Sequence, residues 1–217
     1  MFYLLLFAHL LADYPLQSNW MVSNRGRPAV RLLHVFSHFL VSLVFTLFYV
    51  PTAWPFLILL AGIHFLIDSG KYFVSQTRPN LVIFPYLFDQ VLHLLSIILI
   101  SVLIAGYTSV PPFAIHPVWL ILSIAYLVVT YVTYISEKTL TSQNKAYYQQ
   151  VIDKKWSRMV ARAIFLTIPI ILWLFTPTLL STSTLVFPYK LHNFGPRALI
   201  TDIIIAGSGA VFILIVV

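Results

Sequence analysis

The sequence predicts an all-α fold: a polytopic bundle of transmembrane helices with about seven membrane segments. Of its 217 residues, 60% are hydrophobic and only 9% are charged, whereas a soluble domain carries about 25% charged residues. Apolar runs of about 20 residues recur along the whole chain, which is the length that a helix needs to cross a bilayer core. We therefore expect an integral membrane protein without a sizeable soluble domain.

Apolar windows between helix breakers place the membrane segments. They are 2–22, 31–50, 54–74, 83–106, 117–136, 160–182 and 198–217. Pro15 disfavours helical geometry at Tyr14 and removes a backbone donor, so the first segment is expected to be short, kinked or re-entrant. Pro169 and Pro177 predict bends in the sixth segment, which neighbouring helices can accommodate.

The basic residues indicate how these segments are oriented. They gather in three loops: Arg25, Arg27 and Arg31; Lys71 and Arg78; and Lys138, Lys145, Lys154, Lys155, Arg158 and Arg162. The connections 51–53 and 107–116 carry none, and alternation of the spans puts the three basic loops on one side. The positive-inside rule makes that side cytoplasmic, with the N-terminus outside and the C-terminus inside. Lys190 and Arg197 fall on the opposite side, against the rule.

The net charge of +7 belongs to these loops rather than to a basic stripe on a soluble face, so no nucleic-acid binding is expected. The basic loop at about 137–162 also contains Tyr147, Tyr148 and Trp156. This composition suits an interfacial helix that contacts membrane lipids through anionic headgroups. A solvated loop that only sets the topology is an equal interpretation. The chain has no cysteine, which excludes thiolate metal sites and cysteine nucleophiles.

The chemistry of the chain divides it into two regions. Residues 1–106 contain five of the seven histidines and three of the six acidic residues, whereas the helices of 107–217 contain almost no ionisable groups. Asp202 lies near Arg197, and we expect the two to pair. The "AGSGA" run at 206–210 is expected to permit close helix packing.

The polar residues of the first region form pairs with one spacing. The pairs are His9 with Asp13, His34 with His38, His64 with Asp68, and Asp89 with His93. A spacing of four residues stacks two side chains on one face of a helix, where both can reach one metal ion or each other. Chance would give about one such pair in a chain of this composition, and four are present.

The predicted topology places all four pairs at a similar depth. His34 follows the Arg25–Arg31 loop by about one turn, and Asp68 precedes Lys71 by about one turn. Asp89 follows the Arg78 loop, and the first pair precedes the Arg25 loop. We therefore expect one layer of His and Asp side chains in the cytoplasmic half of the membrane.

Such a layer has either a structural or a functional role. Histidines in membrane helices often form interhelical hydrogen bonds, but intramembrane aspartates are costly and mark functional sites. The expected metal ligands are His9, Asp13, His34, His38, His64, Asp68, Asp89 and His93. Imidazole and carboxylate donors without sulfur favour a divalent metal, Zn²⁺ or Mn²⁺, with iron as the alternative. His116 and His192 lie near prolines in loops and are expected to be unrelated.

Other polar residues near the layer have candidate roles. Asp68 or Asp89 is the candidate general base. Lys71 could balance the charge of the layer or receive an anionic group, or it could be an ordinary interfacial lysine. The amides of Gln17 and Gln90 are expected to orient metal ligands.

The motifs "HLLADYPLQ", "HVFSH", "HFLIDSGK" and "FDQVLH" together resemble a family of bacterial integral membrane proteins, domain of unknown function 3307, over about residues 1–106. The resemblance implies a multi-pass protein of the bacterial inner membrane, and it brings no established activity.

Three functions remain open at this point. The first is a metal-dependent hydrolase of a lipid or lipid-linked substrate, in which the ion activates water. The second is a cation or proton-coupled transporter or channel that uses the same layer, although the extracellular half carries few polar residues. The third is a structural or accessory membrane protein without activity. A di-iron oxygenase is less well supported, because the adjacent-histidine boxes of membrane desaturases are missing.

Overall fold

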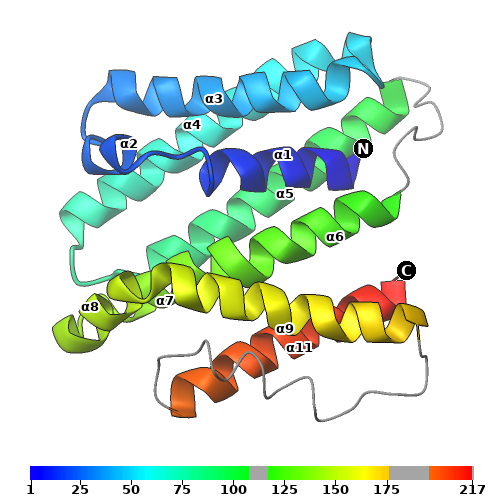
Figure 1. Ribbon diagram of the computed structural model, residues 1–217. Helices are drawn as coiled ribbons and strands as arrows, with labels where there is room; N and C mark the ends of the chain where they lie inside the picture. Colours follow the sequence, from blue (N-terminus) through cyan, green and yellow to red (C-terminus); the bar gives the residue numbers. More distant parts are fainter. Residues whose placement is uncertain (108–116, 176–195, 217) are drawn as a thin grey trace. The chain divides into compact units, whose positions relative to one another are not determined.

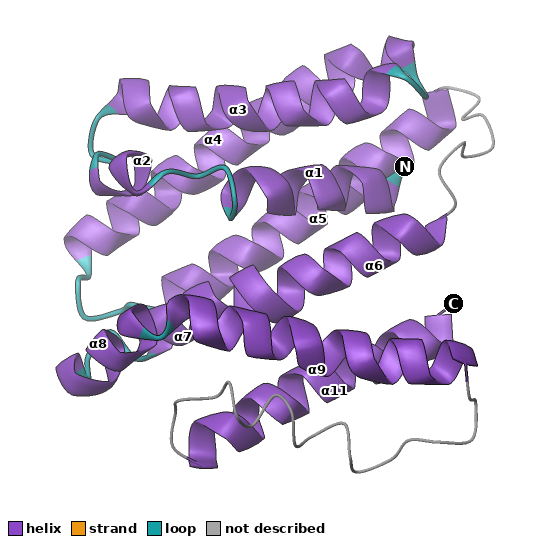
Figure 2. Ribbon diagram, in the orientation of Figure 1, coloured by secondary structure: helices purple, strands orange, loops and turns teal. Residues whose placement is uncertain are grey.

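A computed structural model of the chain describes residues 1–107, 117–175 and 196–216. These residues form helices and connecting turns, and none of them belongs to a strand (Figure 2). The prediction of an all-α fold is confirmed. The chain divides into two compact units, Met1–Leu120 and Ile121–Val217, and each unit is described by itself below. His116, Pro177 and His192 lie outside the described residues.

The first unit consists of four long or medium helices joined by short elements. They are α1 (Phe2–Asp13), α2 (Asn19–Ser23), α3 (Pro28–Leu47), the 3₁₀ turn η1 (Pro51–Ala53), α4 (Trp54–Thr77) and α5 (Ile83–Tyr107) (Figure 1). Prolines occupy the first turns of α3 and α4, where their missing N–H costs no helical hydrogen bond. Ser18 caps α2 by accepting the Met21 N–H at 3.2 Å.

Within residues 1–107, 117–175 and 196–216, four segments have the length and apolar composition of membrane spans. They are Pro28–Leu47, Pro51–Thr77, Ile83–Tyr107 and Pro117–Leu140. In the first predicted segment, 2–22, the helix ends at Asp13, just before Tyr14 and Pro15. Its 12 residues extend about 18 Å, which is too short to cross a bilayer core of about 30 Å. A membrane protein is thus supported, but the seven predicted spans are not confirmed.

The helices of the first unit close into a four-membered ring. α1 packs against α3 and α5, α3 packs against α4, and α4 packs against α5. One end of this bundle is an apolar core made of Leu5, Val50, Ala53, Leu57, Ile97, Ile100 and Ile104. The predicted polar pairs lie farther along each helix, toward the end that carries α2. The outward faces are apolar, with Phe36 53%, Leu66 70% and Val102 63% exposed, as lipid contact requires.

The second unit is also built from helices. It contains α6 (Pro117–Leu127), which the unit boundary divides, the π-helical turn η2 (Val128–Val132), α7 (Thr133–Leu140), α8 (Lys145–Asp153), α9 (Lys155–Phe175) and α11 (Pro196–Val216). α9 packs against α11 and η2. A Cβ atom at Gly209 would lie 2.9 Å from Val129 Cγ2. Glycine at this position therefore allows the close packing that the "AGSGA" run predicts.

Three buried charged side chains and the half-buried Glu137 join the helices of the second unit. Asp202 on α11 accepts hydrogen bonds from Arg158 and Arg162 on α9, at 2.7–3.0 Å. Glu137 on α7 accepts from the same two arginines, and also from the Tyr147 hydroxyl at 3.0 Å. Asp202 is fully buried and Arg162 is 1% exposed. We call these four residues, Glu137, Arg158, Arg162 and Asp202, the charge quartet.

The charge quartet alters two expectations from the sequence. The region 137–162 is largely helical rather than a loop, and Arg158 and Arg162 are buried in ion pairs instead of facing headgroups. Asp202 pairs with these two arginines, whereas the side chain of Arg197, its expected partner, lies outside the described residues. The sequence contains no local pattern for the quartet, because its acidic and basic members are 21 to 44 residues apart.

Replacing Asp202 tests the structural role of the quartet. We expect Asp202→Ala to lower the free energy of unfolding by about 3–5 kcal/mol, because it leaves two buried guanidinium groups without one of their carboxylates. Thermal unfolding of the purified protein in detergent measures this change. The control is Asp153→Ala, since Asp153 is exposed and pairs only with the Gln149 amide among the contacts described; its effect should stay within about 0.5 kcal/mol. Equal stabilities of the two variants would contradict the assignment.

Candidate metal centre

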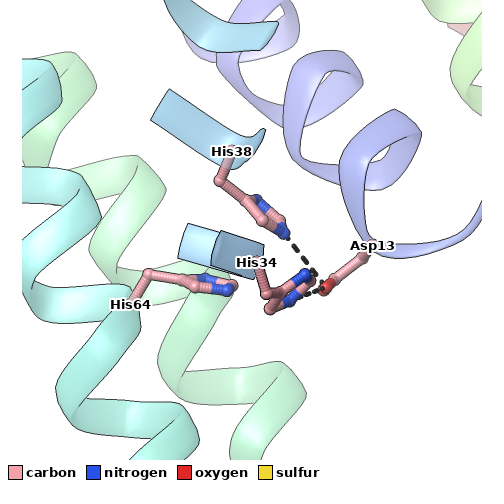
Figure 3. Close-up of side chains that lie close together, drawn as sticks. All are labelled: Asp13, His34, His38 and His64. Atoms are coloured by element: carbon pink, nitrogen blue, oxygen red, sulfur yellow. Dashed lines mark hydrogen bonds and ion pairs between the residues drawn. The ribbon is translucent and has the colours of Figure 1, made fainter. Parts of the chain in front are cut away.

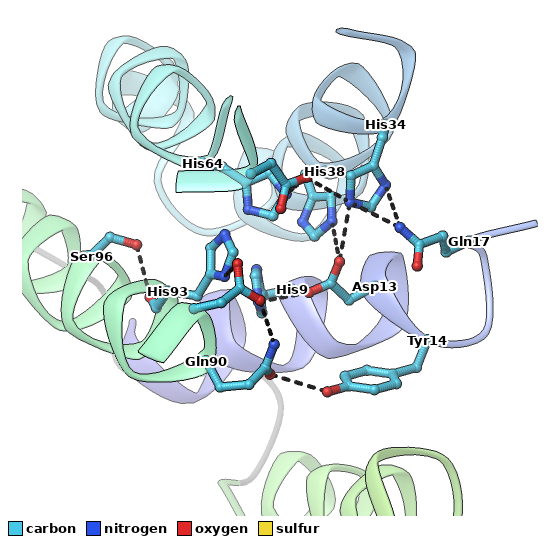
Figure 4. A network of polar contacts seen from close by, with 12 residues as sticks. His9, Asp13, Tyr14, Gln17, His34, His38, His64, Gln90, His93 and Ser96 are labelled. Carbon is cyan, nitrogen blue, oxygen red and sulfur yellow. Dashed lines mark hydrogen bonds and ion pairs between the residues drawn. The ribbon is translucent and has the colours of Figure 1, made fainter. Parts of the chain in front are cut away.

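The four predicted pairs meet in the interior of the first unit. α1 contributes His9 and Asp13, α3 contributes His34 and His38, α4 contributes His64 and Asp68, and α5 contributes Asp89 and His93. The spacing of four residues puts both members of each pair on one face of their helix, and Figure 4 shows the five histidines and Asp13 turned toward one another. α1 and α4 run toward the end that carries α2, and α3 and α5 run away from it, so the pairs lie at the same level. We call these eight side chains the His/Asp layer.

Asp13 is a common acceptor within the layer. Its Oδ1 lies 3.1 Å from His34 Nε2 and 3.2 Å from His38 Nε2 (Figure 3). Its Oδ2 lies 3.2 Å from His9 Nε2, one helical turn back on α1. One carboxylate from the first helix thus holds imidazoles from two helices, which fixes the ring orientations on α3.

The imidazole rings are packed against one another. The centroids of His38 and His64 are 4.0 Å apart, those of His64 and His93 are 4.3 Å apart, and those of His9 and His93 are 5.0 Å apart. All five histidines of the layer are buried, with exposed fractions from 2% to 8%. His64 therefore occupies a central position, with rings from all three other helices around it.

Asp89 is held by a second group of polar side chains. Its Oδ2 accepts a hydrogen bond from Lys71 Nζ at 2.5 Å and one from Gln90 Nε2 at 3.0 Å. Gln90 in turn accepts from the Tyr14 hydroxyl at 3.1 Å. Burial, followed by the neighbouring Tyr86, raises the pKa of Tyr14 above its usual value, so this phenol stays a donor. Lys71 thus compensates the charge of a carboxylate that is only 3% exposed.

Several buried polar atoms of the layer lack a hydrogen-bond partner among the described residues. They are His64 Nε2, both ring nitrogens of His93, and Asp89 Oδ1. His64 Nε2 is 3.6 Å from Asp68 Oδ2, and His93 Nδ1 is 3.6 Å from Asp89 Oδ1, which is too far for a hydrogen bond. Buried polar groups are normally satisfied. Converging but unpaired imidazole and carboxylate atoms are therefore consistent with donors that a cation would bring together.

Two sets of donors have the separation that a metal site needs. One ligand atom from each of Asp13, His34, His38 and His64 lies within 4.8 Å of the others, and the same holds for His64, Asp68 and His93. Nitrogen and oxygen donors without sulfur suit Zn²⁺, Mn²⁺ or iron. His64 belongs to both sets. The two sets can therefore hold one ion, or two ions of which only one is bound by His64.

A cavity that is large enough for a small ligand lies beside the layer. This cavity of about 110 Å³ has walls formed by Gln17, Arg25, Arg31, His34, Asp68 and Lys71, among others. A second space of about 10 Å³ lies beside His9, His38 and His64, and it has room for about one water. A ligand can thus approach the layer from the side of α2 and of the basic residues.

The structure brings together every site residue that the sequence predicts. Gln17 Nε2 lies 3.3 Å from His34 Nε2, and Gln90 contacts Asp89, so both predicted amides contact members of the layer. Sequence reasoning missed Tyr14, and it missed Arg25 and Arg31 as lining residues of the cavity. The positions of basic residues between helices indicate topology, and their spacing gives no sign of which arginines line a cavity.

Comparison with known proteins gave one match. A sequence profile described as "Protein of unknown function (DUF3307)" matches residues 1–122, more than half of the chain. No curated protein and no solved structure matches the chain. The matched region contains the whole His/Asp layer and both arginines of the cavity.

Cysteine cross-linking tests whether the helices converge as described. The chain has no native cysteine, so only the introduced thiols can react. We expect His9→Cys combined with His93→Cys to be joined efficiently by a short bifunctional thiol reagent, because the two rings are 5.0 Å apart. Mass spectrometry of proteolytic peptides detects the product. The control pairs His93→Cys with Leu66→Cys, since Leu66 is 70% exposed on the outside of α4. Similar yields for both pairs would contradict the arrangement.

Proposed function

The chain belongs to the DUF3307 family, and we propose that it is a membrane-embedded, metal-dependent hydrolase of a lipid or lipid-linked substrate. The family description states no activity, so the proposal depends on the chemistry of the site. The observation that carries it is the meeting of five buried histidines and three aspartates, of which Asp89 is buried and Asp13 and Asp68 are half-buried, in one layer beside a cavity. We propose Zn²⁺ or Mn²⁺ as the ion, with iron as the alternative.

The residues of the layer have distinct roles in this proposal. When bound, the metal lowers the pKa of a water molecule and polarises the substrate oxygen. Asp13 orients His34 and His38 through its Oδ1, and second partners of this kind fix the ring that binds a metal. Asp68 lines the cavity and accepts the proton of the attacking water. Asp89 is engaged by Lys71 and Gln90, which favours Asp68 over Asp89 as the general base.

The position of the cavity supports action at one membrane face. Arg25, Arg31 and Lys71 line it. They lie in or beside the connections between helices at one end of the bundle, the end that the positive-inside rule puts in the cytoplasm. We therefore propose an inner-membrane enzyme of bacteria that acts at the cytoplasmic leaflet, with its N-terminus outside. Arg158 and Arg162 are buried, so contact with anionic headgroups falls to Trp156, which is 64% exposed, and to the neighbouring Lys155.

The end of the bundle farthest from the cavity is apolar, and this favours an enzyme over a transporter. The apolar core around Leu57 and Ile100 lies between the His/Asp layer and that end. The buried hydroxyls of Thr46, Ser96 and Ser101 donate to carbonyls of their own helices. A transport pathway needs polar groups on both sides of its ion site, and this arrangement offers access from one side.

Metal analysis is the first test. We expect the full chain, purified without chelators, to contain about one or two ions of Zn²⁺ or Mn²⁺ per molecule, and His64→Ala to lose most of this metal because His64 belongs to both donor sets. Elemental analysis measures the content. Ser101→Ala is the matched control, since it removes a buried hydroxyl that bonds to its own helix, and it should keep the metal. A metal-free wild-type protein would overturn the proposal.

Turnover is the second test. We expect Asp68→Asn to reduce metal-dependent hydrolysis of bacterial lipid extract by about 100- to 10,000-fold, as loss of a general base does. Mass spectrometry of the released products measures it, with metal content and thermal stability recorded for each variant. Metal-dependent ion flux into liposomes without any lipid turnover would assign the site to transport instead. Substitutions that lower stability but change neither flux nor turnover would indicate an accessory protein.

A further inference from the structure

The cavity beside the His/Asp layer is unusually rich in cationic side chains for the interior of a membrane protein. Arg25, Arg31 and Lys71 all lie on its walls, and Asp68 is the one carboxylate there. Lys71 is already paired with Asp89. No carboxylate pairs with Arg25 or Arg31 in the part of the chain that the structure describes. Arg25 and Arg31 thus line the cavity without an ion-pair partner, although the Asp68 carboxylate lies on the same walls.

Both arginines are held in place by contacts that leave donors free. Arg31 Nη1 donates to the Arg25 carbonyl at 2.7 Å, and its guanidinium lies 4.9 Å from the centre of the Tyr72 ring. Its Nε is buried and has no hydrogen-bond partner among the described residues. Arg25 Nη2 donates to Gln17 Oε1 at 3.2 Å. These contacts orient the arginines while leaving hydrogen-bonding capacity for a ligand.

Gln17 connects the arginines to the metal centre. Its Oε1 accepts from Arg25, and its Nε2 lies 3.3 Å from His34 Nε2. His34 belongs to the first donor set, and Asp68 belongs to the second. Both also line the cavity. A group bound there would lie against one member of each donor set.

We propose that the cavity binds a phosphate group and that the substrate is a phosphate ester. This inference rests on the proposed function and specifies its substrate class. Arginine is the side chain best suited to phosphate, because its planar group gives two parallel charge-assisted hydrogen bonds. The cavity volume of about 110 Å³ is several times the roughly 10–15 Å³ that one water needs on the same measure, so it has room for a small anion. A neutral carboxylic ester would leave Arg25 and Arg31 without an anionic partner.

The reaction that follows is hydrolysis of a phosphoester. The oxygen of water forms a bond to phosphorus, and the bond from phosphorus to the substrate's ester oxygen breaks. Asp68 takes one proton from the water and then gives it to the leaving oxygen, which departs as an alcohol. The products are inorganic phosphate and an alcohol when the substrate is a monoester. Arg25, Arg31 and Lys71 stabilise the charge on the phosphate oxygens during this step.

Binding of inorganic phosphate to the full chain in detergent tests the inference. We expect calorimetry to show binding to the wild type, and Arg31→Gln to weaken it by about ten- to a hundredfold, as loss of a charged hydrogen bond does. Arg31→Lys should restore part of the affinity by restoring the charge. The control is Arg27→Gln, because Arg27 is in the same loop, is exposed and does not line the cavity. Metal content, measured on every variant, reports whether the bundle is intact.

The outcomes separate this inference from the proposed function. If the wild type and Arg31→Gln both hold metal and bind phosphate equally, or if neither binds it, the phosphate site is wrong while the metal centre stands. If phosphate binds in an Arg31-dependent manner to a metal-free wild type, the anion site stands and the hydrolase fails. Competition by phosphatidic acid, but not by diacylglycerol, in mixed micelles would assign a lipid phosphate. Competition by neither would assign a soluble phosphate ester.

Discussion

The shared hydrogen bonding of Asp13 with imidazoles from two helices is the interaction on which the first unit depends. A carboxylate in a membrane interior costs several kcal/mol unless it is paired, and α1 alone can offer it only His9. Packing α1 against α3 supplies His34 and His38 at 3.1–3.2 Å from the same oxygen. The short first helix, which cannot span a bilayer, is thereby fixed in the bundle by polar contacts as well as by its apolar residues Leu4 and Leu5.

The two units bury charge in different ways, and the difference separates structure from function. In the charge quartet two arginines meet two carboxylates, and each carboxylate accepts from both arginines. The His/Asp layer instead contains buried atoms of His64, His93 and Asp89 without partners among the described residues. A paired group of opposite charges stabilises packing, whereas unpaired convergent donors cost energy unless something binds them. This contrast is why the first unit carries the proposed site.

The helices of the first unit are polar at one end and apolar at the other, and this asymmetry sets the direction of access. Each helix passes from the core around Leu57 and Ile100 to the His/Asp layer and then to the basic loops. The cavity opens among those loops. A substrate whose apolar part stays in the lipid and whose anionic part reaches the arginines would fit such a gradient.

The sequence by itself predicted the helical and apolar character of the chain, the first residues of α1, α4, α5 and α6, and the eight members of the layer. Composition, proline positions and the spacing of four residues are local properties, and they act within one helix. Only the tertiary structure decided that Asp13 is the common acceptor, that Lys71 pairs with Asp89, and that Arg25 and Arg31 face the cavity. It alone revealed the charge quartet. These contacts depend on the rotation of each helix against its neighbours, which is set by packing between residues far apart in the chain.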